Sequence, residues 1–244
     1  MEKQVDLFRY LQGQDQDQEL DQEQDQEQEQ EQDPHPHPAP APAPDLNHEK
    51  KGPAEELGEL GEKCLECQRC SLREGAQNVI FGEGSPYARI IFIGEGPGAE
   101  EDRIGRPFVG AAGLLLDRIL AACNLKREEI YIANVVKCRP RGNRTPQKKE
   151  IDACLPLLKR QIEIIDAPIL VCLGAVASKA LIEPAFSITA QRGRWLQIDG
   201  RHVMPTFHPA ALLRDPRKKR PVWEDMQKIM EKYRDLFPEG GKDR

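Results

Sequence analysis

Residues 90–102 read Ile-Ile-Phe-Ile-Gly-Glu-Gly-Pro-Gly-Ala-Glu-Glu-Asp, and this stretch decides the fold. Four apolar residues in a row, rich in β-branched side chains, predict a buried strand, and a glycine-rich turn loaded with acids follows at once. A helical pattern then begins at Ala111. A strand, a glycine turn and a helix together build a pocket at the carboxyl end of a strand in α/β sheets. Because the carboxylates would repel a phosphate, we expect this pocket to hold a neutral, hydrogen-bonding ligand.

The rest of the body alternates buried strands with helices. Asp199-Gly200 joins two further short strands and is a strong hairpin signal. This alternation predicts an α/β fold in residues 54–238, a three-layer α/β/α sandwich around a mainly parallel sheet. We predict strands at 89–94, 130–136, 169–173, 194–198 and 202–206, and helices at 55–67, 111–123 (apolar face Leu114, Leu115, Ile119, Leu120), 147–165, 174–182, 210–214 and 221–235.

Residues 1–53 have a different composition from the body. Residues 14–33 are almost entirely Asp, Glu and Gln, and residues 34–44 alternate Pro with His or Ala. The first segment cannot bury apolar area and the second favours a stiff, extended spacer, so we predict a mostly disordered tail. The tail is interpreted as a solubilising segment. The alternatives are a protein-binding amphipathic helix at 3–12, or an acidic mimic of DNA that competes for the body.

The net charge of the chain, −6, hides two parts of opposite sign. Residues 1–50 hold 14 of the 41 acids and three of the 35 bases, a net of −11, so the remainder carries +5. A basic body suits a polyanionic partner. The sequence has no apolar run long enough to cross a membrane and no signal-peptide pattern at its start, so we expect a cytoplasmic protein with no membrane contact.

The seven cysteines are an odd number, and in a cytosolic chain they favour a metal site or buried thiols over disulfides. Two thiols separated by two residues can reach one metal, and two more from the middle of the chain can close a four-cysteine site. Spacing alone separates neither zinc from an iron–sulfur cluster nor a metal site from unrelated buried thiols. The candidates are Cys67, Cys70, Cys138 and Cys154; Cys64 could pair with Cys67 instead, and Cys123 and Cys172 fall in apolar patterns typical of the core.

Two polar residues and one aromatic residue are candidates for the rim of the pocket. Asn134 lies near the end of the strand predicted at 130–136. There its amide could offer a donor and an acceptor side by side, as reading a base edge requires. His208 lies where a strand gives way to a helix, and Phe108 lies in the loop Gly-Arg-Pro-Phe-Val-Gly. Each could equally be structural: a capping Asn, a core His and a core Phe.

Four motifs together resemble the family 4 uracil-DNA glycosylases, the iron–sulfur branch of the uracil-DNA glycosylase superfamily. They are Gly94-Glu95-Gly96-Pro97-Gly98, Gly105-Arg106-Pro107-Phe108-Val109-Gly110, the run from Asn134 to Pro140, and the run from His208 to Arg214. The similarity covers residues 60 to 236, in order. It implies a four-stranded parallel sheet between helices and a structural 4Fe–4S cluster. In the family pattern the first Cys pair precedes a small residue and Leu, as in Cys70-Ser71-Leu72, which implies Cys67, Cys70, Cys138 and Cys154 as ligands and leaves Cys64 as an extra thiol.

The resemblance also implies the reaction, hydrolysis of the bond between uracil and deoxyribose in base excision repair of deaminated cytosine. By resemblance, Phe108 stacks on a flipped uracil, Asn134 donates to O4 and accepts from N3–H, and His208 hydrogen-bonds O2 as negative charge develops there. Glu100 lies near C5 and would exclude the methyl group of thymine. The backbone of Gly94 to Gly96, Glu95 included, would bind the remaining polar edge of the base. Glu95 could orient water, stabilise the cationic sugar, or only shape the loop.

DNA contact is expected from two basic stretches beside the pocket and from an apolar wedge that replaces the flipped base. Leu212 or Leu213 is the candidate wedge, with simple helix packing as the alternative role. Covalent relatives of the family use a histidine in an inserted basic loop. That histidine is missing after Arg144, so we expect turnover. We also expect a monomer. A non-enzymatic iron–sulfur module would not need Asn134 and His208 at strand ends. The basic stretches are Lys137, Arg139, Arg141, Arg144, Lys148 and Lys149, and Arg214, Arg217, Lys218, Lys219 and Arg220.

Overall fold

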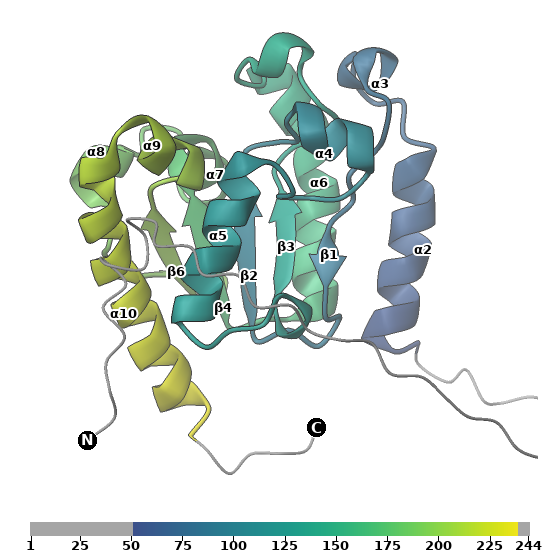
Figure 1. The fold of residues 1–244 in the computed structure, drawn as a ribbon. Helices are drawn as coiled ribbons and strands as arrows, with labels where there is room; N and C mark the ends of the chain where they lie inside the picture. The colour runs from purple at the N-terminus through teal and green to yellow at the C-terminus, as the bar shows by residue number, and fades with distance from the viewer. Residues whose placement is uncertain (1–50, 239–244) are drawn as a thin grey trace, which may run out of the picture.

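A computed structural model describes residues 51–238 of the 244. The predicted disorder of the tail up to residue 50 and the predicted helix at 3–12 lie outside the described residues. Figure 1 shows a central sheet with helices packed on both of its faces, and this confirms the predicted α/β class. None of the helices over residues 51–238 combines the length and the apolar character needed to cross a membrane.

The sheet has six strands in the order β1-β3-β2-β4-β6-β5, so the expectation of four strands is wrong. The four central strands are parallel, and the edge strands β1 and β5 pair antiparallel to β3 and β6. β1 has only two residues and no apolar alternation, so no sequence pattern predicts it. The strands are β1 (Glu83–Gly84), β2 (Ile90–Gly94), β3 (Tyr131–Asn134), β4 (Ile169–Leu173), β5 (Leu196–Ile198) and β6 (Arg201–Thr206).

Two hydrophobic cores lie on opposite faces of the sheet. Along β2, Ile91 and Ile93 belong to one core while Ile90 and Phe92 belong to the other, as expected where successive side chains alternate between faces. The first core includes residues of α2 (Pro53–Leu65), α6 (Lys148–Ile165) and α7 (Gly174–Leu181), and the second includes residues of α5 (Ala111–Ala122), α9 (Pro209–Arg214) and α10 (Lys219–Leu236). The three layers predicted from the sequence are therefore present.

Most predicted elements occur within a few residues of their expected bounds, and the differences have local causes. The apolar face predicted for α5 is wrong at Leu114, which is 56% exposed, whereas Leu116 is buried in its place. The acidic turn after β2 contains a short helix, α4 (Ala99–Ile104), that the sequence did not predict. The hairpin between β5 and β6 is confirmed, with Asp199 and Gly200 at φ 48° and 77°, the left-handed pair that a tight hairpin requires. Further short segments are α3 (Leu72–Gly75), α8 (Ile188–Gln191) and three turns of 3₁₀ helix, η1 (Arg127–Glu129), η2 (Arg141–Asn143) and η3 (Pro216–Lys218).

The strand register brings the ends of the parallel strands to one edge. Gly94 at the end of β2 pairs with Asn134 at the end of β3, and Leu173 at the end of β4 pairs with Thr206 at the end of β6. Residues that follow these strands therefore meet at the carboxyl edge of the sheet, where α/β proteins place their ligand sites.

Candidate functional site

An open pocket of about 330 Å³ lies at the carboxyl edge of the sheet. It is formed by the loop after β2, the loop before α5, the end of β3 and the start of α9. Asn134, Phe108 and His208, which are 26 or more residues apart in sequence, all line it. The lining residues are Gly96, Gly98, Ala99, Glu100, Glu101, Phe108, Gly110, Ala111, Ala112, Asn134, Asn143, His208 and Ala210.

Asn134 is nearly fully buried, with 2% of its surface exposed. Its neighbour across the strands is Gly94, where an added Cβ would lie 2.4 Å from Asn134 Oδ1 and 2.5 Å from Phe108 Cζ. Only glycine leaves room for both side chains at this point. Gly94 thus leaves space for the two side chains, although it is buried and does not itself line the pocket.

His208 is the N-cap residue of α9, and its ring nitrogen Nδ1 accepts a hydrogen bond from the backbone N–H of Ala210 at 3.1 Å. A neutral imidazole has one donor and one acceptor nitrogen, so this bond assigns the proton to Nε2. Burial and the charge of the nearby Arg214 together lower the pKa of His208 to about 4, against the opposing charge of Glu101. At neutral pH the ring is therefore uncharged and offers Nε2–H as a donor.

A buried carboxylate anchors β6, the strand that precedes His208. Thr206 Oγ1 donates to Asp225 Oδ2 at 2.5 Å, and Arg192 Nε donates to the same oxygen at 2.9 Å. Asp225 is 1% exposed and lies on α10. This contact fixes the end of β6 two residues before His208.

Phe108 is buried and its ring faces the imidazole of His208, with the ring centroids 5.5 Å apart and an interplanar angle of 27°. The two rings come from loops on different strands of the sheet. Aromatic rings can stack on planar ligands, and Phe108 brings one such ring to the pocket lining.

The acids of the glycine turn have different surroundings. Glu101 is a brace: Oε1 accepts from the N–H groups of Val109 and Gly110 at 3.0 and 2.8 Å, and Oε2 accepts from Gly98 at 3.1 Å. Asp102 is buried and its Oδ1 accepts from the N–H groups of Gln77 and Asn78. Both carboxylates hold loops together.

Glu100 and Glu95 have different surroundings from Glu101 and Asp102. Glu100 lines the pocket, is exposed, and pairs with Arg103 at 2.8 Å. Glu95 does not line the pocket. Burial raises the pKa of Glu95, while a hydrogen bond with the Thr145 side chain and the charge of Arg214 oppose that rise.

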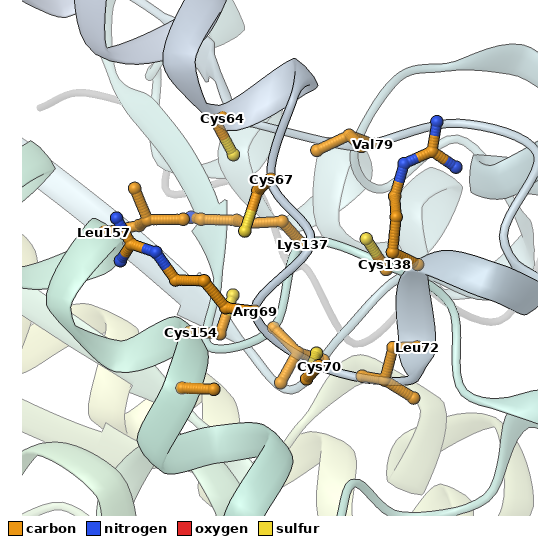
Figure 2. A pocket seen from close by; sticks show the side chains of 13 residues that line it. Cys64, Cys67, Arg69, Cys70, Leu72, Val79, Lys137, Cys138, Cys154 and Leu157 are labelled. Atoms are coloured by element: carbon orange, nitrogen blue, oxygen red, sulfur yellow. The ribbon is translucent and has the colours of Figure 1, made fainter.

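A second cavity is lined by five cysteines (Figure 2). Cys67 follows α2, Cys70 precedes α3, Cys138 follows β3, and Cys154 lies on α6. The four predicted ligands thus come from three segments, since Cys67 and Cys70 share the loop between α2 and α3, and all four line one cavity. Cys64, at the end of α2, lines the same cavity and is fully buried, whereas Cys123 and Cys172 belong to the hydrophobic cores.

The lining of the cysteine cavity is rich in sulfur and in positive charge. Its five thiols are of the residue type that ligates zinc and iron–sulfur clusters. The lining also contains Lys137, Arg69 and Arg73, whose positive charges would offset those of four thiolates.

Lys137 connects the two cavities, although the sequence predicts it only as a DNA contact. Its side chain is fully buried, its Nζ donates to the backbone carbonyl of Asn134 at 3.0 Å, and it also donates to Gln161 Oε1. Burial lowers the pKa of Lys137 to about 8, and the sulfurs of Cys154 and Cys64 oppose that shift. The prediction that Lys137 contacts DNA is wrong, because its side chain is buried.

The remaining candidates for DNA contact fall into two groups. Arg144 pairs with the buried Glu150 through two hydrogen bonds of 2.8 and 2.7 Å, and Arg139 donates to Asn143 Oδ1 at 2.7 Å. On α9, Leu213 is 48% exposed, whereas Leu212 is 1% exposed and belongs to the second core. Arg214 follows them and lies near both His208 and Glu95.

Asn143 is a pocket residue that the sequence did not reveal. It lies in the turn η2 with φ 56° and lines the pocket. Gly142-Asn143 is a common turn pair, so the only available signal was its position between two arginines of a basic stretch.

Comparison with known proteins agrees with this arrangement of motifs. Residues 81–227 match the model of the uracil DNA glycosylase superfamily. The chain is 48% identical over 181 residues to a type-4 uracil-DNA glycosylase of Thermotoga maritima, with 71% of this chain and 93% of that protein covered. It is 41% identical over 203 residues to a type-4 uracil-DNA glycosylase of Sulfurisphaera tokodaii, with 77% and 92% covered. A type-5 uracil-DNA glycosylase of Pyrobaculum aerophilum is 28% identical over 146 residues, with 53% and 64% covered. The chain is a type-4 member of the uracil-DNA glycosylase superfamily.

Proposed function

We propose that this protein removes uracil from DNA by hydrolysing the N-glycosidic bond, which releases free uracil and leaves an abasic site. The observation that carries this proposal is the meeting of Asn134, Phe108 and His208 in one pocket at the carboxyl edge of the sheet. The pocket offers an amide, a flat apolar face and a neutral imidazole donor. A uracil base inside a duplex cannot reach such a pocket, so it must be flipped out at a cost of a few kcal/mol.

Asn134 is proposed to read the base edge. Its amide would donate to O4 and accept from N3–H of uracil, and cytosine reverses both groups. Since Asn134 is buried, cytosine would leave unpaired polar atoms there, at a cost of about 1–3 kcal/mol for each. Phe108 is proposed to stack on the base, a contact typically worth about 1–3 kcal/mol.

His208 is proposed to stabilise the charge that develops on uracil O2 as the bond breaks. The neutral ring suits this role, because Nε2–H can donate to an anion without a competing proton equilibrium near neutral pH. Donors of this kind contribute about 3–4 kcal/mol to the transition state. His208, Asn134 and Glu95 form the proposed catalytic set.

Glu100 and Glu95 are given separate roles in the proposal. Glu100 stands at the rim of the pocket and would exclude the methyl group of thymine at C5. Glu95 lies behind the rim near Arg214, so it would act on the sugar side, by orienting water or by stabilising the cationic sugar. The backbone from Gly94 to Gly96 would bind the remaining edge of the base.

DNA would bind across the basic surface around the pocket. Of the two candidate leucines, the exposed Leu213 fits the wedge that fills the gap left by the flipped base, and the buried Leu212 fits helix packing. Arg139, Arg144 and Arg214 are proposed to contact phosphates, with Arg144 limited by its pairing to Glu150.

A structural 4Fe–4S cluster is proposed for the cysteine cavity, held by Cys67, Cys70, Cys138 and Cys154. The cluster would tie α2, β3 and α6 together, and it needs no electron transfer because hydrolysis is not a redox reaction. The glycosylase domain is proposed to span residues 54–238. A monomeric state, a cytoplasmic location and a protein partner for residues 3–12 stay predictions.

The proposal is tested with the full-length, cluster-loaded protein and an oligonucleotide that contains one uracil. Treatment with alkali after incubation should cut the strand at that position, with uracil opposite guanine, opposite adenine or in single-stranded DNA in separate reactions. Oligonucleotides with thymine or cytosine at the same position should stay intact. No scission at uracil by a protein with an intact cluster would overturn the proposed function.

A further inference from the structure

Phe108 has a backbone conformation that large apolar residues avoid. Its φ is 53°, in the left-handed region. The other non-glycine residues in this region over residues 51–238 are all Asn or Asp, which tolerate it because their short polar side chains bond locally. They are Asn124, Asn143, Asp166 and Asp199. Such strain persists only where the surroundings hold it in place.

The group that holds this conformation is the guanidinium of Arg127, in η1. Nη1 of Arg127 donates to the carbonyl of Phe108 at 3.1 Å, and Nη2 donates to the carbonyl of Pro107. The planar fork of arginine thus binds two successive carbonyl groups, one on each side of the strained residue's N–Cα bond. The loop also packs closely against Gly113 on α5, where an added Cβ would lie 1.9 Å from the Phe108 carbonyl oxygen.

Arg127 is itself fixed by two carboxylates. Nη1 also donates to Asp117 Oδ1 at 2.8 Å, and Nε donates to Glu83 Oε1 at 3.2 Å. Glu83 is held in turn by Arg106, two residues before Phe108, through hydrogen bonds of 2.8 and 2.7 Å. These contacts form a closed ring from Arg106 through Glu83 and Arg127 back to the loop. The side chain of Arg127 is 18% exposed and is not part of the pocket lining.

The backbone constraint determines where the ring of Phe108 stands. The ring tip fits against Gly94, and the ring face lies opposite His208 at 5.5 Å. If the carbonyl of Phe108 were released, the residue could relax to negative φ, and the ring would leave this position. The rotation would change the stacking face without changing any group that touches the base edge.

We propose that Arg127 is a positioning residue for base recognition: it holds Phe108 in the left-handed conformation that presents its ring to the flipped uracil. This rests on the proposed function and on the stacking role proposed for Phe108. Arg127 touches neither the base nor the sugar and acts only through the loop it binds.

The test is a double-mutant cycle on kcat/KM for release of uracil, with Arg127→Ala, Phe108→Ala and the double variant. Loss of a charged donor should lower kcat/KM by about 10- to 100-fold in the Arg127→Ala protein. In the Phe108→Ala background, the same Arg127 substitution should cost less than about twofold, because the ring it positions is already absent. A merely structural role would give similar losses in both backgrounds, and that result would overturn the proposal.

Two control variants match this cycle. Arg118→Ala removes the same charge from an exposed site on α5 and should retain wild-type kcat/KM. Arg127→Lys keeps the charge without the planar fork and should lose nearly as much as Arg127→Ala. If Arg127→Ala fails to fold, Asp117→Asn loosens the guanidinium instead, and its smaller loss should likewise vanish in the Phe108→Ala background. Full activity in Arg127→Ala would overturn the inference alone, whereas failure of the wild type to release uracil would overturn the proposed function itself.

Discussion

The proton of His208 is located by a single hydrogen bond, the one from the Ala210 N–H to Nδ1. Burial, with the charge of Arg214, opposes a second proton on the ring and lowers the pKa of His208 to about 4. In the proposed reaction, His208 would therefore stabilise the leaving uracil as a neutral donor. Its fixed orientation would require no reorganisation during bond cleavage.

This lowered pKa has a consequence for stability. The folded protein resists protonation of His208 down to about pH 4, whereas the unfolded chain takes up that proton near the ordinary value of 6.5. The contribution of His208 to stability is therefore complete above pH 6.5 and is lost as the pH falls toward 4, by about 3 kcal/mol in all. Urea unfolding of wild type and His208→Gln between pH 7 and pH 4 measures it. Parallel curves for the two proteins would contradict this assignment.

Gly94 is expected to be essential for the shape of the pocket. In Gly94→Ala, the new Cβ would meet Asn134 Oδ1 and Phe108 Cζ at 2.4 and 2.5 Å, so both side chains must shift. We expect kcat/KM for uracil release to fall by at least about tenfold. The matched control is Gly58→Ala on α2, where no atom lies within 4 Å of the new Cβ. Equal kinetics in the two variants would show that the close approach at Gly94 is unimportant.

At the scale of elements, α9 contains two adjacent leucines with opposite environments. Leu212→Ala should lower the free energy of unfolding by about 2–5 kcal/mol because it empties part of the core. Leu213→Ala should leave stability within about 0.5 kcal/mol of wild type. If Leu213 is the wedge, its removal should slow uracil release from double-stranded DNA more than from single-stranded DNA. The same slowing on both substrates would argue against a wedge.

The cysteine cavity joins the end of α2, the segment after β3 and the start of α6, and its five thiols exceed the four that a cluster needs. Cys67→Ser should therefore lose the visible absorption of the iron–sulfur cluster and part of the thermal stability of the protein. Cys64→Ser should keep both, because Cys64 is expected to be the extra thiol. Iron content and absorption after purification without oxygen measure the difference. If only Cys64→Ser lost the cluster, Cys64 would be the ligand and Cys67 the extra thiol, which contradicts the prediction.

For the whole molecule, the sequence was sufficient to predict the layers and the edge of the sheet that holds the pocket. The apolar runs at β2, β3 and β4 and the hairpin at Asp199-Gly200 carry strong periodic or turn signals. β1 was missed because two residues have no period. The expected count of four strands omits the two antiparallel edge strands, which raise the count to six.

The candidate site was predictable only in part. Asn134, Phe108 and His208 stand at motif positions and are brought together by the strand register. Lys137 looked like a surface base, and only tertiary packing shows that it is buried between the two cavities. Glu101 looked like one more acid of the turn, yet it binds three backbone N–H groups from two loops. Contacts between distant segments leave no periodic signal in the sequence.

The central claim is that Asn134 selects uracil in this pocket, and the most direct measurement is the single-turnover rate of uracil release by wild type and Asn134→Ala. The amide-matched control is Gln197→Ala, on the edge strand β5 away from the pocket. We expect Asn134→Ala to lose about 100-fold or more in rate, since it removes two hydrogen bonds to the base edge, with its fold and cluster intact. The control should match the wild type. A wild-type rate in Asn134→Ala would contradict the account.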